Sequence, residues 1–135
     1  MEQEESFAAK QRFFRGKELD ELKKLDVREF AKFLKSRPRR AIMRNFNLIE
    51  KFIRQCEQNT GKNKPIRTHK RDIIIMPALV GMTIAVHNGK EFFPIKITQE
   101  MMGHRLGEFS LTRKKVEHGS PGIGATKSSS SLSVK

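Results

Sequence analysis

The side chains best able to do chemistry in this chain are its cations. Lysine and arginine number 28 against 15 aspartate and glutamate residues, which gives a formal net charge of +13. This balance suits a polyanionic partner, and nucleic acid is the first candidate. The clustered basic residues flank the apolar stretches without interrupting them, as phosphate contacts around a small core require. They are Arg37, Arg39, Arg40, Arg67, His69, Lys70, Arg71, Lys90, His104, Arg105, Arg113, Lys114 and Lys115.

Residues for catalysis or metal binding form no recognisable pattern. The four histidines lack the spacing of metal ligands, and no metalloprotease, paired-carboxylate or nucleophile-elbow motif is present. Cys56 alone permits neither an internal disulfide nor a multi-cysteine zinc site, and its apolar neighbours Phe52 and Ile53 favour a buried thiol. We therefore expect no enzyme, no cofactor and no metal.

Two compositional features indicate where the protein is located and where its aromatic residues lie. No apolar run approaches membrane-spanning length, and the acidic residues 1–5 do not form a signal peptide, so we expect an intracellular protein without membrane contact. The chain has ten phenylalanines but no tryptophan or tyrosine. An exposed platform for stacking bases is therefore not obvious, and most phenylalanines are expected in the core.

The element expected to position these cations is a β-hairpin centred on Asn88-Gly89. This dipeptide is typical of a type I′ turn, in which both central residues have φ > 0. A two-residue turn would pair His87 with Lys90 and Ile84 with Phe93. Because side chains alternate between the two faces of a strand, one set would then share the core face. That set is Met82, Ile84, Val86, Phe93, Ile95 and Ile97.

Other segments are expected to cover this hairpin. Apolar spacing predicts helix over residues 19–34, with a break and cap at Asp26, and a second helix over 42–58. Pro38 should end the first helix, which would place Arg37, Arg39 and Arg40 in the joint between the two. The β-branched run 72–76 is the natural third strand, and residues 98–109 a short helix or broken turn.

These elements predict an α+β fold class with a small three-stranded antiparallel sheet and short helices. We expect a helical N-terminal extension over residues 1–64 and an RNA-binding core over 65–111. A flexible basic and Gly-Ser-rich tail is expected over 112–135, because its glycines and its serine run cannot build a core.

Several motifs together resemble one protein family. They are Thr68-His-Lys-Arg-Asp-Ile-Ile-Ile-Met-Pro77, Ile84-Ala-Val-His-Asn-Gly-Lys90, Met102-Gly-His-Arg-Leu-Gly-Glu-Phe-Ser110 and His118-Gly-Ser-Pro-Gly-Ile-Gly-Ala-Thr126. Here the chain is similar to the universal small-subunit ribosomal protein family that is numbered nineteen in bacteria and fifteen in eukaryotic cytosolic ribosomes. The stretch before Pro65 and the tail motif resemble the archaeal and eukaryotic branch of that family.

The resemblance implies a structural constituent of the small ribosomal subunit head in the cytoplasm. It implies binding to small-subunit rRNA, contact with the neighbouring head protein of the family numbered thirteen, and a tail that reaches tRNA at the decoding region. The tail residues concerned are His118, Gly119, Gly122, Gly124 and Lys127. Ser120 departs from the family pattern, which has arginine there, and Lys127 stands where histidine is usual. The alternative is a free-standing RNA- or DNA-binding regulatory protein.

Overall fold

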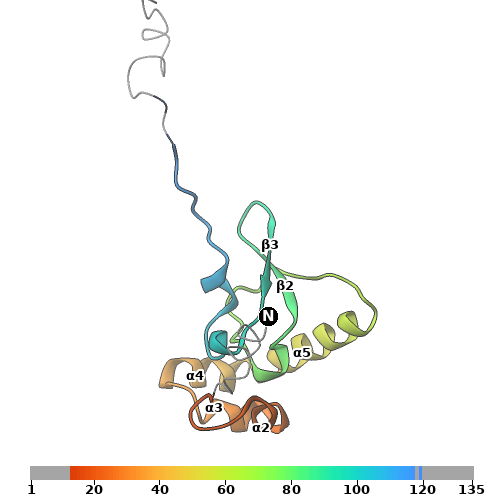
Figure 1. Ribbon diagram of the computed structural model, residues 1–135. Coiled ribbons are helices and arrows are strands. Elements are labelled where there is room, and N and C mark those ends of the chain that lie inside the picture. The colour runs from red at the N-terminus through yellow and green to blue at the C-terminus, as the bar shows by residue number, and fades with distance from the viewer. Residues whose placement is uncertain (1–12, 118, 120–135) are drawn as a thin grey trace, which may run out of the picture.

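The computed structural model describes residues 13–117 and residue 119. Helices come first along the chain and a small sheet follows (Figure 1). The α-helices are α2 (Leu19–Lys24), α3 (Val27–Ala31), α4 (Ser36–Arg44) and α5 (Phe46–Gly61). The strands are β1 (Ile66–Thr68), β2 (Thr83–His87) and β3 (Phe92–Lys96), and the 3-10 turns are η1 (Pro77–Leu79), η2 (Gln99–Met101) and η3 (Leu106–Phe109). The α+β class is therefore confirmed.

The helical half follows the predicted pattern with one correction. The break at Asp26 is present, and the Asp26 N–H donates to the Glu29 carboxylate at 3.1 Å as part of a capping box. Helix α4 includes the arginine run that was expected to form a joint, so that prediction was wrong. Pro38 lies in the first turn of α4, where its missing N–H would have no helical acceptor.

The sheet has the order β1-β2-β3 and is mixed, which corrects the expectation of an all-antiparallel sheet. β2 and β3 pair antiparallel as predicted, whereas β1 pairs with β2 in parallel, with Ile66 opposite Ile84 and Thr68 opposite Val86. The predicted third strand, residues 72–76, is not part of this sheet. β1 was missed because its three residues follow Pro65 in a stretch whose composition is typical of a linker.

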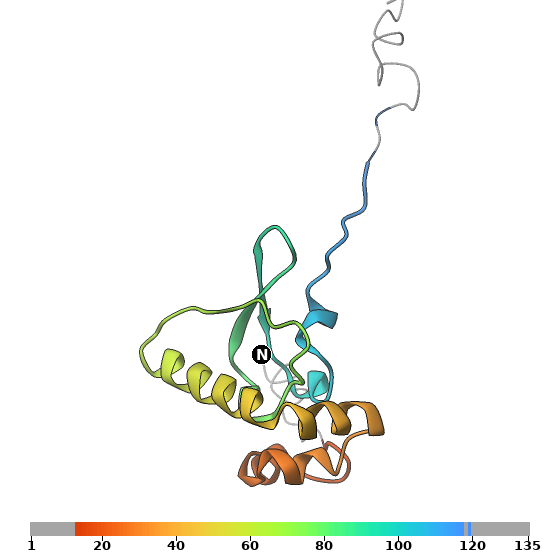
Figure 2. The same cartoon turned by 180° about the vertical axis from the view of Figure 1, so that it is seen from behind.

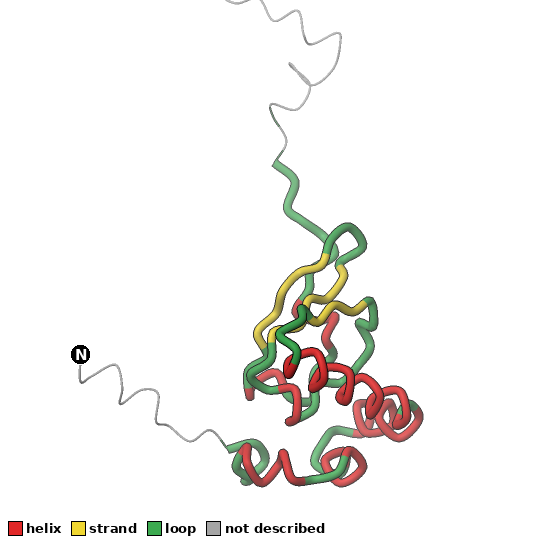
Figure 3. The backbone as a smooth tube through the Cα atoms, turned by 90° about the vertical axis from the view of Figure 1, so that its right-hand side faces the viewer, coloured by secondary structure: helices red, strands yellow, loops and turns green. Residues whose placement is uncertain are grey.

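The apolar run 73–76 instead separates two hydrophobic cores. Ile73 and Ile75 pack against the sheet, whereas Ile74 and Met76 pack among the helices. The run pairs irregularly with residues 103–107, since the Ile75 N–H donates to the His104 carbonyl at 2.8 Å. A segment buried on both sides has a continuous apolar sequence, and so it cannot be the edge of a half-exposed sheet. Figures 2 and 3 show the α-helices gathered on one side of the strands.

The hairpin has a four-residue loop over residues 88–91, so the predicted register was wrong by two positions. His87 lies opposite Phe92 and Ile84 opposite Ile95. The Asn88 carboxamide accepts hydrogen bonds from the Lys90 and Glu91 N–H groups at 3.0 and 2.9 Å, and Gly89 alone in this loop has a positive φ, +99°. An even shift leaves every side chain on its predicted face.

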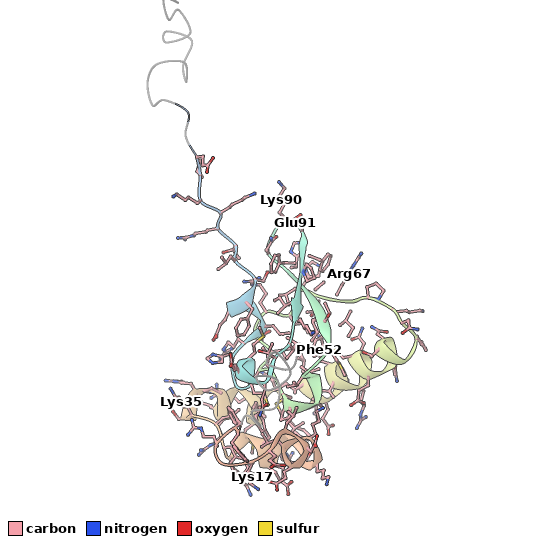
Figure 4. The ribbon with its side chains drawn as sticks, viewed as in Figure 1. Lys17, Lys35, Phe52, Arg67, Lys90 and Glu91 are labelled. Atoms are coloured by element: carbon pink, nitrogen blue, oxygen red, sulfur yellow. The ribbon has the colours of Figure 1, made fainter. Side chains whose placement is uncertain are left out.

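Near the base of the hairpin, the residues that face the core are those predicted. Ile84, Val86, Ile95 and Ile97 are all buried, and Phe52 and Cys56 of α5 pack against the same cluster. Figure 4 shows Phe52 on the side of α5 that faces the sheet. Phe93 departs from the prediction, because it is 49% exposed near the tip, where the hairpin extends beyond the core.

Candidate nucleic-acid interface

Charge is distributed unevenly along the chain. Residues 1–34 carry eight acidic and eight basic side chains, so the entire net charge of +13 belongs to residues 35–135. In Figure 4, Lys17 lies at the helical end, whereas Arg67 and Lys90 lie toward the hairpin end. The residues from α4 onward, and not those of α2 and α3, therefore suit a polyanion, and the hairpin end is one part of that basic surface.

The cations at this end come from β1, from the residues that follow it and from the hairpin loop. Arg67, His69, Lys70 and Lys90 are all exposed. A side-chain turn begins at Thr68, whose hydroxyl accepts the Lys70 N–H at 3.0 Å. The sheet thus brings to one end of the molecule basic residues that stand 20 to 23 positions apart in the sequence.

Sequence reasoning missed His87 and Phe92 as members of this surface. The rings of His69, His87 and Phe92 lie with their centres 4.4 to 5.1 Å apart, and the Arg67 guanidinium lies 5.6 Å from the centre of the Phe92 ring. His87 and Phe92 meet because they are directly opposite in the observed register. The two-residue turn had placed His87 opposite Lys90, so no sequence signal indicated this cluster.

Arg71 differs from its basic neighbours because three backbone carbonyls already accept its donors. Nη1 donates to the His87 carbonyl at 2.6 Å, and Nη2 donates to the carbonyls of Gly107 and Ser110 at 2.8 and 2.6 Å. Ser110 is fully buried, and its hydroxyl donates to the Val86 carbonyl at 3.3 Å. Arg71 therefore joins the end of β2 to the segment from which residues 111–117 leave the domain.

Arg39 has a similar structural role among the helices. Its guanidinium donates to the carbonyls of Ala31, Lys32 and Leu34 at 3.0 to 3.3 Å, beyond the last turn of α3. The Ala31 carbonyl also accepts the Leu34 N–H at 3.1 Å, and a cation there suits the negative end of the helix dipole. Arg37 and Arg40 are exposed on α4 and form a separate basic face, away from the hairpin tip.

His104 and Arg105 point outward, as predicted, in the turn before η3. His104 Nδ1 lies 2.8 Å from a Glu108 carboxylate oxygen, and Arg105 Nη1 donates to the Asp72 carbonyl at 3.3 Å. The Glu108 carboxylate is thus close to His104, and a backbone carbonyl accepts one donor of Arg105. This part of the surface is less strongly cationic than the part around Arg67 and Lys70.

Residues 112–117 run away from the domain on the side of the hairpin tip (Figure 1). Arg113, Lys114 and Lys115 are exposed along this segment, and Gly119 is exposed as well. The other predicted tail residues, His118, Gly122, Gly124 and Lys127, lie outside the described residues.

Within the described residues, none of the helices combines the length and apolar composition needed to cross a bilayer. These residues also include no cluster of three or more His, Cys, Asp or Glu side chains arranged to hold a metal ion.

Comparison with known proteins identifies the family. A curated relative, the small ribosomal subunit protein uS19 of Saccharolobus solfataricus, is 48% identical over 127 residues, which span 90% of each chain. The profile of the family Ribosomal protein S19 matches residues 15–118, from the segment before α2 to the end of the extended segment after η3. The chain therefore belongs to the ribosomal protein S19 family.

Proposed function

We propose that this chain binds small-subunit rRNA through the cations at its hairpin end. The chain is a structural, non-enzymatic constituent of the small ribosomal subunit in the cytoplasm. The proposal rests on one observation. A single small sheet places Arg67, His69 and Lys70 at the same end of the molecule as the hairpin loop that contains Lys90. Such contacts neutralise phosphates and fix the orientation of the protein on the RNA.

The predicted cations fall into three groups under this proposal. We expect Arg67, Lys70, Lys90 and the extended cations Arg113, Lys114 and Lys115 to contact phosphates directly, with Arg37 and Arg40 forming a second contact on α4. His69 is expected to contact the RNA beside them. Arg71 and Arg39 act mainly by holding the fold, since carbonyls accept their donors. His104 and Arg105 contribute less, because the Glu108 carboxylate lies beside His104 and the Asp72 carbonyl accepts a donor of Arg105.

Binding and co-sedimentation with small subunits test this proposal. A double variant, Arg67→Ala with Lys70→Ala, should lower the affinity for small-subunit rRNA and reduce the slope of log K against log salt by about 1 to 2 units. The matched control, Lys23→Ala with Lys24→Ala in α2, should bind like the wild type. Equal binding by both double variants, at every salt concentration, would contradict the proposed interface.

Two finer assignments belong to the same proposal. The chain contacts the neighbouring head protein of the family numbered thirteen, and its tail reaches tRNA at the decoding region. Both rest on the resemblance of the sequence motifs, and the course of residues 112–117 away from the domain supports a tail that reaches beyond it (Figure 1). Deleting residues 119–135 should leave incorporation into subunits nearly intact but weaken tRNA binding. Lost incorporation would make the tail an anchor, and unchanged tRNA binding would remove its proposed role.

A further inference from the structure

Three aromatic rings meet on the side of the sheet that the core does not use. The His69 and His87 ring centres lie 4.4 Å apart, and Phe92 lies 5.1 and 4.9 Å from them, nearly edge-on to both. His69 is exposed, and the other two rings are half-buried. The cluster therefore has a supported inner side and an outer ring that is open to solvent.

The fold holds these rings in place without a ligand. His87 and Phe92 are cross-strand partners, and Arg67 in β1 lies beside Ala85 of β2, whose neighbours on the same face include His87. The Gly89 N–H donates to His87 Nδ1 at 3.0 Å, which fixes the imidazole against the hairpin loop. Rings that are already oriented lose little conformational freedom when a partner stacks on them.

The rest of this sheet face is open and basic. Thr83, Pro94 and Lys96 are exposed, and a hollow lined by Thr83, Ala85, Pro94, Lys64 and Pro65 continues the surface away from the rings. Between residues 62 and 90 the chain has a single acidic residue, Asp72. Its basic residues there are Lys62, Lys64, Arg67, Lys70, Arg71 and Lys90.

This charge favours a nucleic acid over an apolar peptide as the occupant. Aromatic rings next to cations on an exposed sheet face allow an unpaired base to stack while its phosphates meet the basic residues. A base stacks without sequence-specific hydrogen bonds, so the rings need supply only their faces. The guanidinium of Arg67, close to Phe92, widens the planar surface.

We propose that His69, His87, Phe92 and Arg67 form a stacking site for one unpaired base of RNA. The inference rests on the proposed rRNA-binding function and deepens it, because it adds a base contact to contacts with phosphate. His69, as the exposed ring, provides the surface on which the base lies. His87 and Phe92 support that ring from the sheet.

The test uses the full chain and a short oligouridylate with one central 2-aminopurine, whose fluorescence falls when the base stacks. A second probe has an abasic site at the same position. His69→Ala removes the exposed ring, and His69→Phe keeps a ring without an ionisable group. Phe93→Ala is the matched control, because Phe93 adjoins Phe92 but belongs to the opposite face of β3. Thermal unfolding of each variant verifies that it folds.

Wild type, His69→Phe and Phe93→Ala should quench the fluorescent probe. His69→Ala should bind that probe about 5- to 150-fold more weakly and lose the quenching, the range typical of one base on one ring. All four proteins should bind the abasic probe equally. An equal loss on both probes, or no loss on either, would overturn the stacking site.

Binding to small-subunit rRNA separates this inference from the function on which it rests. If wild type fails to bind that rRNA, the proposed function fails. If wild type binds and His69→Ala binds equally well in both assays, only the stacking site fails. Unchanged RNA binding with poor incorporation of His69→Ala into reconstituted subunits would show that a protein covers the rings, which also overturns the proposal.

Discussion

Arg71 shows that a cation in a basic run can serve the fold. Its guanidinium donates to three carbonyls from two distant segments, residue 87 of β2, residue 107 within η3 and residue 110 directly after it. A fork of fixed N–H donors can bind several acceptors at once, which a lysine ammonium cannot do with the same geometry. These contacts leave little space for a side chain at residue 107, since a Cβ on Gly107 would lie 3.0 Å from the Arg71 carbonyl oxygen.

Replacing Arg71 should therefore affect stability more than affinity. Arg71→Ala should lower the free energy of unfolding by about 2 to 4 kcal/mol, because three carbonyls lose charge-assisted hydrogen bonds. Lys70→Ala, one position away and exposed, should change the stability by less than about 0.5 kcal/mol and weaken RNA binding instead. Urea denaturation of both variants measures the difference. An Arg71→Ala protein as stable as Lys70→Ala would show that the Arg71 hydrogen bonds contribute nothing to the free energy of unfolding.

These residue roles explain why the sequence predicted the basic surface but not which groups each cation contacts. Composition and spacing indicated correctly that cations flank the hairpin. Whether a guanidinium meets phosphate or carbonyl depends on backbone positions 16 to 39 residues away, as for Arg71. The ring cluster was unpredictable for the same kind of reason, because it depends on the pairing of residue 87 with residue 92.

At the scale of elements, the face of the hairpin proved more predictable than its register. The alternation of apolar residues determined which side chains are buried, and a slip of two positions preserves that alternation. The loop length instead followed from the Asn88 carboxamide, which accepts two loop N–H groups and so stabilises a longer turn. The third strand was misplaced because the run 73–76 has the β-branched composition of a strand, although it is buried between two cores.

Helix α5 contains a buried thiol, Cys56, whose ionisation depends on folding. Burial of Cys56, with a smaller contribution from Glu57, raises its pKa from 9.0 to about 11. The unfolded chain therefore ionises this thiol at lower pH than the folded chain. Its contribution to stability is complete below pH 9 and is lost as the pH rises through 11.

Between pH 8 and pH 10 the wild type should consequently lose about 1 kcal/mol more unfolding free energy than Cys56→Ala, in which the thiol is absent. Comparing the two proteins cancels the titration of their shared lysines. Chemical denaturation at each pH provides the measurement. Parallel pH profiles would show that the thiol ionises equally in the folded and unfolded chain.

At the scale of the whole molecule, the region of α2 and α3 carries no net charge, and the excess of basic residues follows it, so RNA is expected on the surfaces formed by the later residues. The extended residues 112–117 leave from the hairpin end (Figures 1 and 3). Replacing Arg113, Lys114 and Lys115 together with alanine should reduce the slope of log K against log salt by about 2 to 3 units, since up to three phosphate contacts are lost. Thermal stability should stay unchanged because all three side chains are exposed. An unchanged slope would place this segment away from RNA.

The orientation of the chain on rRNA is the central claim, and an electron cryo-microscopy map of small subunits that contain this chain tests it most directly. The map should show the sheet face with Arg67 and Lys70, the Lys90 loop and residues 113–115 against rRNA phosphates. Helices α2 and α3, whose region carries no net charge, should lie away from that contact. A map with α2 and α3 against the rRNA, and with Arg67, Lys70 and Lys90 facing solvent, would contradict this orientation.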